Sequence, residues 1–307
     1  MINFRYHVVS LTAVFLALAI GLVVGTAALN GPAADLLKDR VDALSKDNSN
    51  YRAQANQYRE ELNRSEEFAA EVAPALLAGK LAGRKILVVV LPSGKDHAEG
   101  VTSMLKIAGA TITGQVTVQD KFLDPANNVE LLELTEKASR PTVPIDGLPL
   151  NLNAVETASA LLARALLVKT DPVAEQDLTA VLSAYTTLGY LGVSEEMVPG
   201  AEATVVVSGL PPVDREAGKK NQNAVTVTTQ FVENRPVVVA GNRIGEGNLV
   251  AEVRNDPTLV TKVSTVDNAS TAQGQLATAL TVVERLAAGK VGQYGLDAAS
   301  RVPKAAS

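Results

Sequence analysis

The sequence predicts one N-terminal transmembrane helix, an α-helical coiled-coil stalk, and an α/β domain with a doubly wound, Rossmann-like, mostly parallel sheet. Three observations predict this fold class. The chain opens with a long apolar run free of charged residues, continues with apolar residues at heptad spacing, and then alternates strand-like and helix-like segments. We therefore divide it into a cytoplasmic stub with the membrane helix (1–30), a stalk (31–74), a hinge (75–84), the extracytoplasmic α/β domain (85–296) and a disordered tail (297–307).

The membrane helix is predicted from the run Val8–Leu29, because no Asp, Glu, Lys or Arg occurs between Arg5 and Asp35. At about 1.5 Å per residue, this run spans the roughly 30 Å hydrocarbon core of a bilayer. A cleaved signal peptide has a shorter apolar core and a more basic start, although the small residues at 26–28 leave a cleavage site open. We expect an uncleaved signal-anchor.

The flanking charges predict the orientation of this helix. Arg5 lies close to its N-terminal end, whereas the first basic residue on the other side is Lys38, which favours a cytoplasmic N-terminus and an extracytoplasmic bulk. Ala17, Gly21 and Gly25 recur every fourth residue and would let two helices pack closely. Such residues are also common in unpaired membrane helices, so this spacing alone does not decide whether the helix is paired or unpaired.

The stalk is predicted from a seam of apolar residues spaced about 3.5 positions apart. Asn48 in this seam is typical of two-stranded coils, so we expect a homodimer; the alternative is a single helix that packs on its own domain. Pro74 is expected to end or kink the helix, and Gly79 and Gly83 to form the hinge. The seam consists of Leu37, Val41, Leu44, Asn48, Tyr51, Ala55, Tyr58 and Leu62, and the repeat continues through Ser65, Ala69 and Val72.

The α/β domain is predicted from short apolar runs that alternate with amphipathic segments. A helix with Val101, Met104, Leu105 and Ala108 on one face should end at Gly109. Residues 120–153 contain four prolines and read as irregular, and 222–233 fit a helix or a strand equally well. We expect strands at 85–91, 111–118, 203–208, 236–240 and a last one at 262–266, and further helices at 155–167, at 171–188 with an N-cap at Asp171-Pro172, and at 270–288.

Ligands of doubly wound folds bind beyond the carboxyl ends of the strands. The residues there that could line a pocket are Ser93, Asp96, His97, Asp267 and Asn268. Helix capping explains Ser93 and Asp96 more simply. Asp96, His97 and Asp267 could converge as a carboxylate–imidazole set, but their spacing does not distinguish this from solvated loops. The segment after the first predicted strand, 92–97, lacks the three-glycine dinucleotide fingerprint. We predict no catalytic residue and no enzymatic activity.

The composition of the chain excludes further kinds of function and site. The net charge of −5 gives no basic excess for nucleic acid, and the absence of cysteine excludes disulfides and Cys-zinc sites.

The opening of the chain carries a resemblance to a known family. Arg5, His7 and the segments 9–11, 13–21 and 24–25 resemble the start of actinobacterial copper-transport outer-membrane proteins of the MctB type. The segments 86–91, 264–268 and 289–295 are also similar to that family, so the resemblance covers nearly the whole chain. It implies a role in copper homeostasis or export. Relatives of the SteB type imply instead a cell-separation scaffold with a cytoplasmic membrane-associated partner and the cell-wall hydrolase system.

The residues offer few ligands for copper. Copper(I) prefers thiolates and thioethers and copper(II) accepts imidazole, but the chain has no Cys, two His and three Met. No pair among His7, His97, Met1, Met104 and Met197 has chelating spacing. We predict no metal site and no cofactor, with copper implied by the resemblance alone; an extracytoplasmic α/β enzyme or small-ligand-binding domain remains the third alternative.

Overall fold

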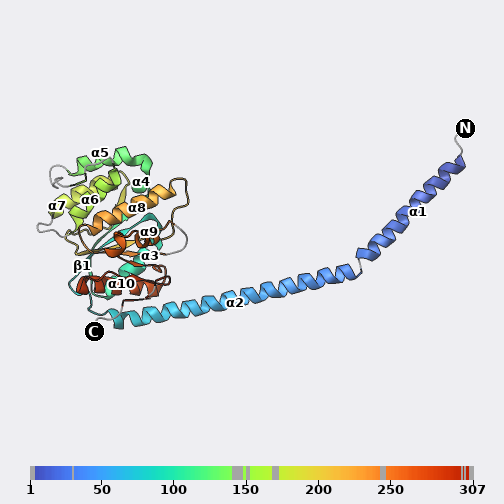
Figure 1. Ribbon diagram of the computed structural model, residues 1–307, viewed down its shortest axis with the longest axis horizontal. Coiled ribbons are helices and arrows are strands. Elements are labelled where there is room, and N and C mark those ends of the chain that lie inside the picture. Colours follow the sequence, from blue (N-terminus) through green and yellow to red (C-terminus); the bar gives the residue numbers. More distant parts are fainter. Residues whose placement is uncertain are drawn as a thin grey trace. The chain divides into compact units, whose positions relative to one another are not determined.

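The computed structural model of the chain describes residues 4–29, 31–139, 148–149, 153–167, 173–242, 247–298, 300 and 302–303 (Figure 1). The chain forms two compact units, 1–64 and 65–307. Each unit is described by itself below.

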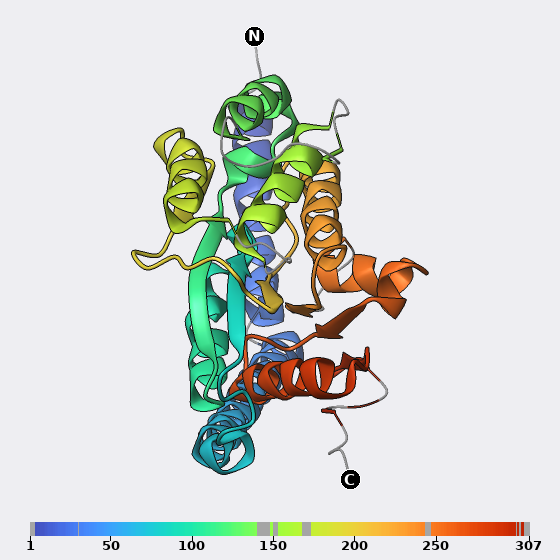
Figure 2. The same cartoon turned by 90° about the vertical axis from the view of Figure 1, so that its left-hand side faces the viewer.

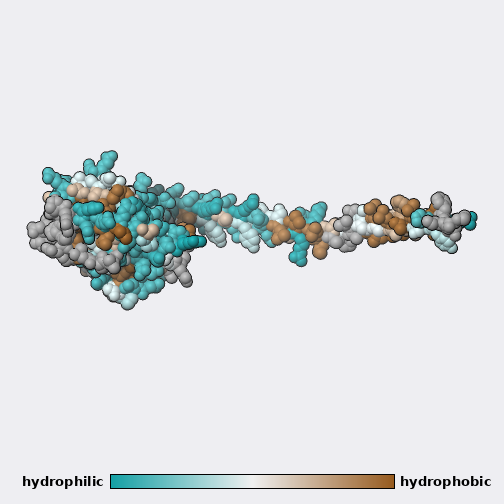
Figure 3. All heavy atoms as spheres, turned by 90° about the horizontal axis from the view of Figure 1, so that it is seen from above, coloured by the Kyte–Doolittle hydropathy of each residue, from teal (hydrophilic) through white to brown (hydrophobic). Residues whose placement is uncertain are grey.

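The first unit is helical. Helix α1 (Phe4–Leu29) contains a stretch, Arg5–Ala27, that is long and apolar enough to cross a membrane. Its described side chains are exposed, as are the large apolar residues at the start of α2 (Pro32–Leu77), and both sets are visible in Figure 3. Every predicted apolar seam residue from Leu37 to Leu62 is exposed, which leaves this face of α2 without a partner among the described residues.

Pro74, which was expected to end or kink the helix, does not end α2. The helix continues through this proline to Leu77. Proline removes the hydrogen bond to the carbonyl of Ala70, but both residues are exposed, so water can satisfy that carbonyl. Within the segment predicted as a hinge, 75–84, Leu77 and Leu81 are fully buried in the core of the second unit.

Within the second unit, the last turns of α2 pack on α10 (Ala272–Ala288). The side chain of Ser65 bonds Gln273, and the carboxylate of Glu66 accepts the backbone N–H of Ala272 at the start of α10. A carboxylate is favourable there because the amino end of a helix carries partial positive charge. From residue 65 onward, α2 therefore packs on its own domain, which is the alternative to an intermolecular coil.

The second unit is built on a seven-stranded sheet of order β3-β2-β1-β4-β5-β6-β7, in which β3 is antiparallel to β2 and the other pairs are parallel. The central strands are continuous apolar runs because helices cover both of their faces. The predicted strands are confirmed, but β3 and β7, with three and two residues, were not predicted. The strands are β1 (Lys85–Val90), β2 (Thr111–Val118), β3 (Leu191–Val193), β4 (Ala203–Val207), β5 (Val237–Ala240), β6 (Val263–Val266) and β7 (Gln293–Tyr294).

Two apolar clusters cover the sheet, one on each face. Ile86, Val88 and Val90 of β1 pack toward α3, α10 and the end of α2, whereas Leu87 and Val89 pack toward α5–α9. Helices α10 and α8 accordingly lie on opposite sides of the sheet (Figures 1 and 2). The remaining helices are α3 (Lys95–Ile107), α4 (Asp120–Leu123), α5 (Asn128–Ser139), α6 (Ala154–Leu166), α7 (Glu175–Thr187), α8 (Ala217–Val232) and α9 (Leu249–Asn255), with short 3₁₀ turns at Pro92–Gly94, Pro125–Asn127 and Leu259–Thr261.

Two helical predictions need correction. The segment predicted as irregular contains α4 and α5, because Leu131 and Leu134 bury one face of a helix and the first proline opens a 3₁₀ turn instead of breaking it. The ambiguous segment is helical, within α8. The predicted cap at Asp171-Pro172 lies outside the described residues, as do 299, 301 and 304–307 of the tail; within the tail, Ser300 bridges to Tyr294.

Candidate functional site

A pocket opens where the chain order of the sheet reverses, beyond the carboxyl ends of β1 and β4. Its volume is about 290 Å³. Sheets of this kind bind ligands at such a switch point, because the connections on either side of it leave in opposite directions. Its apolar walls come from five separate segments of the domain, and they are formed by Leu91, Pro92, Leu123, Leu210, Pro211, Pro212, Val213, Ala224 and Leu249.

The loops after β1 and β4 lie in direct backbone contact at the floor of this pocket. Leu91 N–H donates to the carbonyl of Val207 at 2.9 Å, and Gly209 N–H donates to Ser93 Oγ at 3.0 Å. A Cβ at Gly94 would lie 2.2 Å from the oxygen of Val207, and one at Gly209 would lie 1.9 Å from that of Ser93. Only glycine permits this approach, so the glycines close the space between the two loops.

Two charged side chains of opposite sign line the pocket. Asp120 and Lys220 are its charged lining residues. Lys220 Nζ lies 2.5 Å from Asp214 Oδ2, and its hydrogen bond to Asp214, followed by the charges of Asp120 and Asp124, raises the pKa of Lys220. The same bond lowers the pKa of Asp214. The ammonium of Lys220 is thus already paired with a carboxylate outside the lining, and Asp120 is the other charged group of the lining.

Of the predicted pocket residues, the structure places Ser93 in the wall and the others outside the lining. Ser93 is not a helix cap: α3 begins after Gly94 without a side-chain cap, because Ser93 Oγ instead accepts the N–H of Gly209. Asp96 is exposed in the first turn of α3. His97 Nε2 lies 3.1 Å from Asn242 Nδ2, and Asn242 Oδ1 accepts the N–H of Ser270 at 3.1 Å.

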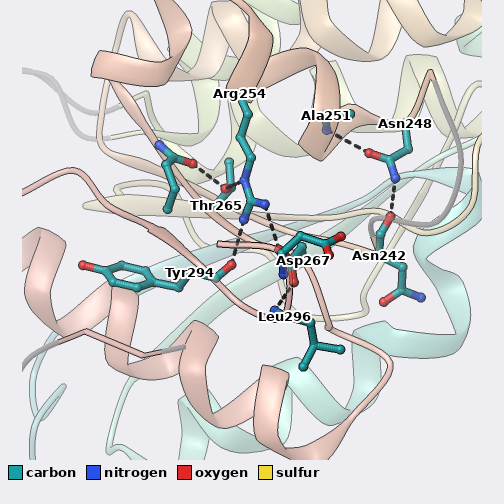
Figure 4. A network of polar contacts seen from close by, with 10 residues as sticks. Asn242, Asn248, Ala251, Arg254, Thr265, Asp267, Tyr294 and Leu296 are labelled. Atoms are coloured by element: carbon teal, nitrogen blue, oxygen red, sulfur yellow. Dashed lines mark hydrogen bonds and ion pairs between the residues drawn. The ribbon is translucent and has the colours of Figure 1, made fainter. Parts of the chain in front are cut away.

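Asp267 belongs to a separate, buried network (Figure 4). Its side chain is fully buried, and its Oδ2 accepts Arg254 Nη1 at 2.7 Å and the N–H of Asp297 at 3.1 Å. Its Oδ1 accepts the N–H of Leu296 at 2.6 Å. Arg254 also donates to Thr265 Oγ1 at 2.8 Å and to the carbonyl of Tyr294 at 2.7 Å. This arrangement holds the segment after β7 in place.

Sequence reasoning missed Arg254, because nothing in the segment 249–255 distinguishes its arginine from a solvated one. Asn268, which follows Asp267 in the chain, donates from Nδ2 to Thr271 Oγ1 at 3.2 Å and borders a second pocket, of about 430 Å³, with Leu276 and Leu296. Among the described contacts, none joins His97 to Asp96 or to Asp267, so the structure does not bring the carboxylate–imidazole set together.

The candidate copper ligands are dispersed. Met104 is buried in the core, Met197 Sδ lies 3.4 Å from Ser194 Oγ, and His7 is exposed on α1; Met1 lies outside the described residues. The described part of the chain contains no group of three or more His, Cys, Asp or Glu side chains arranged to hold a metal ion.

Comparison with known proteins gives a match over nearly the full length. Residues 1–303 match the family described as "Copper transport outer membrane protein, MctB". The chain is 28% identical over 307 residues to the copper transporter MctB of Mycobacterium tuberculosis (strain ATCC 25618 / H37Rv), with 96% of each chain covered. It is 27% identical over 312 residues to the copper transporter MctB of Mycobacterium leprae (strain TN), again over 96% of each.

Proposed function

The chain belongs to the family of MctB copper transport outer membrane proteins, and on that premise we propose that it is a membrane-anchored envelope protein in copper homeostasis or export. The family match over residues 1–303 carries this proposal, and relatives that the chain covers to 96% are named copper transporters. Helix α1, which is long and apolar enough to span a bilayer, supports the anchor. We place its N-terminus in the cytoplasm, on the flanking charges.

In this proposal the chain handles copper without a dedicated site and without catalysing a reaction. Copper(I) favours thiolates and thioethers, yet the chain has no cysteine, and Met104 is buried in an apolar core. His97 contacts Asn242, and both carboxylate oxygens of Asp267 accept hydrogen bonds. These engagements favour an indirect role, in which the chain organises other envelope components.

We further propose that residues 37–62 of α2 form a two-stranded coiled coil with a second copy, as a stalk for a doubly wound domain. The exposed heptad residues Leu37, Val41, Leu44, Tyr51 and Tyr58 support the coil, since exposed apolar seams are stabilised by burial against a partner. The helices on both faces of the sheet and the reversal of chain order between β1 and β4 support the doubly wound assignment.

Gene deletion followed by complementation tests these statements. Cells lacking the gene should grow poorly in copper at concentrations that the parent tolerates. Full-length chain carrying His97→Ala and Met197→Leu should restore growth, because neither residue is needed as a ligand, whereas Leu44→Asp in the seam should not. Normal copper tolerance combined with chained, unseparated cells would refute the copper role and support the cell-separation scaffold. If the chain carrying His97→Ala and Met197→Leu is present at normal abundance but does not restore growth in copper, the indirect role is refuted.

A further inference from the structure

The pocket between the ends of β1 and β4 is not needed for the proposed copper role, yet it is shaped like a binding site. Leu91, Leu123, Ala224 and Leu249 form its inner wall and are each at most 5% exposed. Together with the prolines of the loop after β4, they make a concave apolar surface at the place where such folds bind ligands. We propose that this pocket binds a small, mostly apolar molecule that carries no negative charge.

The rim of the pocket leaves apolar side chains in water. Leu210 is 53% exposed and Val213 is 98% exposed, and both line the pocket. They lie on either side of Pro211-Pro212, whose fixed φ angles restrict the loop that presents them. A bound apolar molecule would cover these side chains and remove their surface from water, which is the main favourable term for such binding.

The charges of the pocket exclude an anion. Lys220 is its lining cation, but the side chain of Lys220 bonds Asp214 and lies in the field of Asp120 and Asp124. Because Lys220 is already paired with Asp214, the carboxylate of Asp120 is left as the lining charge that would repel a ligand carboxylate or phosphate. An uncharged ligand avoids this repulsion, and Asn221 in the same wall offers both an amide donor and a carbonyl acceptor to a hydroxyl or carbonyl group of the ligand.

The backbone excludes a nucleotide at the position that dinucleotides occupy in related folds. There, a glycine-rich loop after the first strand presents N–H groups to the pyrophosphate. Here Pro92 has no N–H, the N–H of Gly94 donates to the carbonyl of Leu91, and the loop lies against Val207 and Gly209. Pro92 and Gly94 therefore offer no free N–H group to a pyrophosphate, and the cavity beside them is lined mostly by apolar side chains.

Photolabelling of the full chain in lipid nanodiscs tests the proposal with two probes that differ by one charge, benzophenone and 4-benzoylbenzoate. Benzophenone should label peptides that contain Leu91, Leu210 or Leu249, identified by mass spectrometry. The anionic probe should label them roughly fivefold less, the effect of one like charge about 4 Å away in water. Asp120→Asn should narrow this difference.

Two substitutions separate pocket labelling from labelling at random. Ala224→Leu fills the pocket and should abolish the label, whereas Thr226→Leu, two residues along α8 and outside the lining, should keep it. Because Ala224→Leu could disturb packing, Leu210→Asp at the exposed rim provides a second block in a chain whose core is unchanged. Equal labelling by both probes, labelling that survives Ala224→Leu and Leu210→Asp, or protection by millimolar ATP or NAD⁺ would overturn the proposal.

Discussion

Asp267→Asn should destabilise the second unit strongly, although it changes one atom. The substitution leaves the Arg254 guanidinium, whose side chain is 14% exposed, without its carboxylate. It also turns an amide N–H₂ toward groups that already donate: either Arg254 Nη1 and the N–H of Asp297, or the N–H of Leu296. Breaking a buried ion pair by removing one partner costs about 3–5 kcal/mol. For a unit the size of residues 65–307, this corresponds to a fall in Tm of about 6–20 °C.

Near-ultraviolet circular dichroism of the full chain measures this effect, because the fully buried Tyr185 and Tyr190 and the nearly buried Tyr294 report the packing of this unit. Hydrogen exchange should also rise at residues 293–297, which the network holds. Glu133→Gln is the matched control, since it removes an ion pair whose side chains are 64–78% exposed and should change stability by about 0.5 kcal/mol or less. A loss for Asp267→Asn no larger than that of the control would refute the assignment of a buried, essential ion pair.

Three further predictions follow from the packing, the tyrosines and the seam. Gly94→Ala should lower the free energy of unfolding by about 1–3 kcal/mol or more, because the added methyl group meets the oxygen of Val207. Gly218→Ala in α8, with open space around it, should raise the free energy of unfolding by up to about 1 kcal/mol, and urea unfolding compares the two variants. Burial, reinforced by Glu130, raises the pKa of Tyr190 to about 12, so the contribution of this tyrosine to stability is complete below pH 10 and is lost as pH rises toward 12. In Glu130→Gln, absorbance at 295 nm should show that Tyr190 ionises at a lower pH, and an unchanged titration would contradict this. Leu44→Cys should form an intermolecular disulfide in a chain that has no other cysteine, while Lys46→Cys, off the seam, should not; equal crosslinking of both would count against the coil.

The central strands could be predicted from the sequence because they are buried on both faces, so their residues form continuous apolar runs such as Val205–Val207. The edge strands could not. Leu191–Val193 and Gln293–Tyr294 are too short to show a period, and neighbouring strands, more than their own residues, determine their conformation. Pro74 was expected to end or kink the helix, and the helix does not end there. A proline indicates that one carbonyl loses its hydrogen bond, but not whether water can reach that carbonyl.

The position of the candidate pocket could be predicted from the sequence, but most of its lining residues could not. Parallel strands indicate that ligands bind at their carboxyl ends, and Ser93 does lie in the wall of the pocket there. The pocket's apolar walls come from the loops after β1 and β4 and from α4, α8 and α9, segments far apart in the chain that only the folded sheet brings together. Asp267 was noticed for its position after a strand, but its partner, Arg254, comes from a helix whose relation to that strand cannot be read from spacing.

The short edges of the sheet have a consequence for a protein confined to a membrane surface. Anchored chains meet at high local concentration, and an open sheet with long unpaired edges would then template edge-to-edge aggregation. Here one edge strand has three residues and runs antiparallel to its neighbour, and the other has two and is bridged by Ser300. Among the described residues, neither edge strand is long enough to pair with more than a few residues of another chain, so crowded copies should not aggregate through the edges of their sheets.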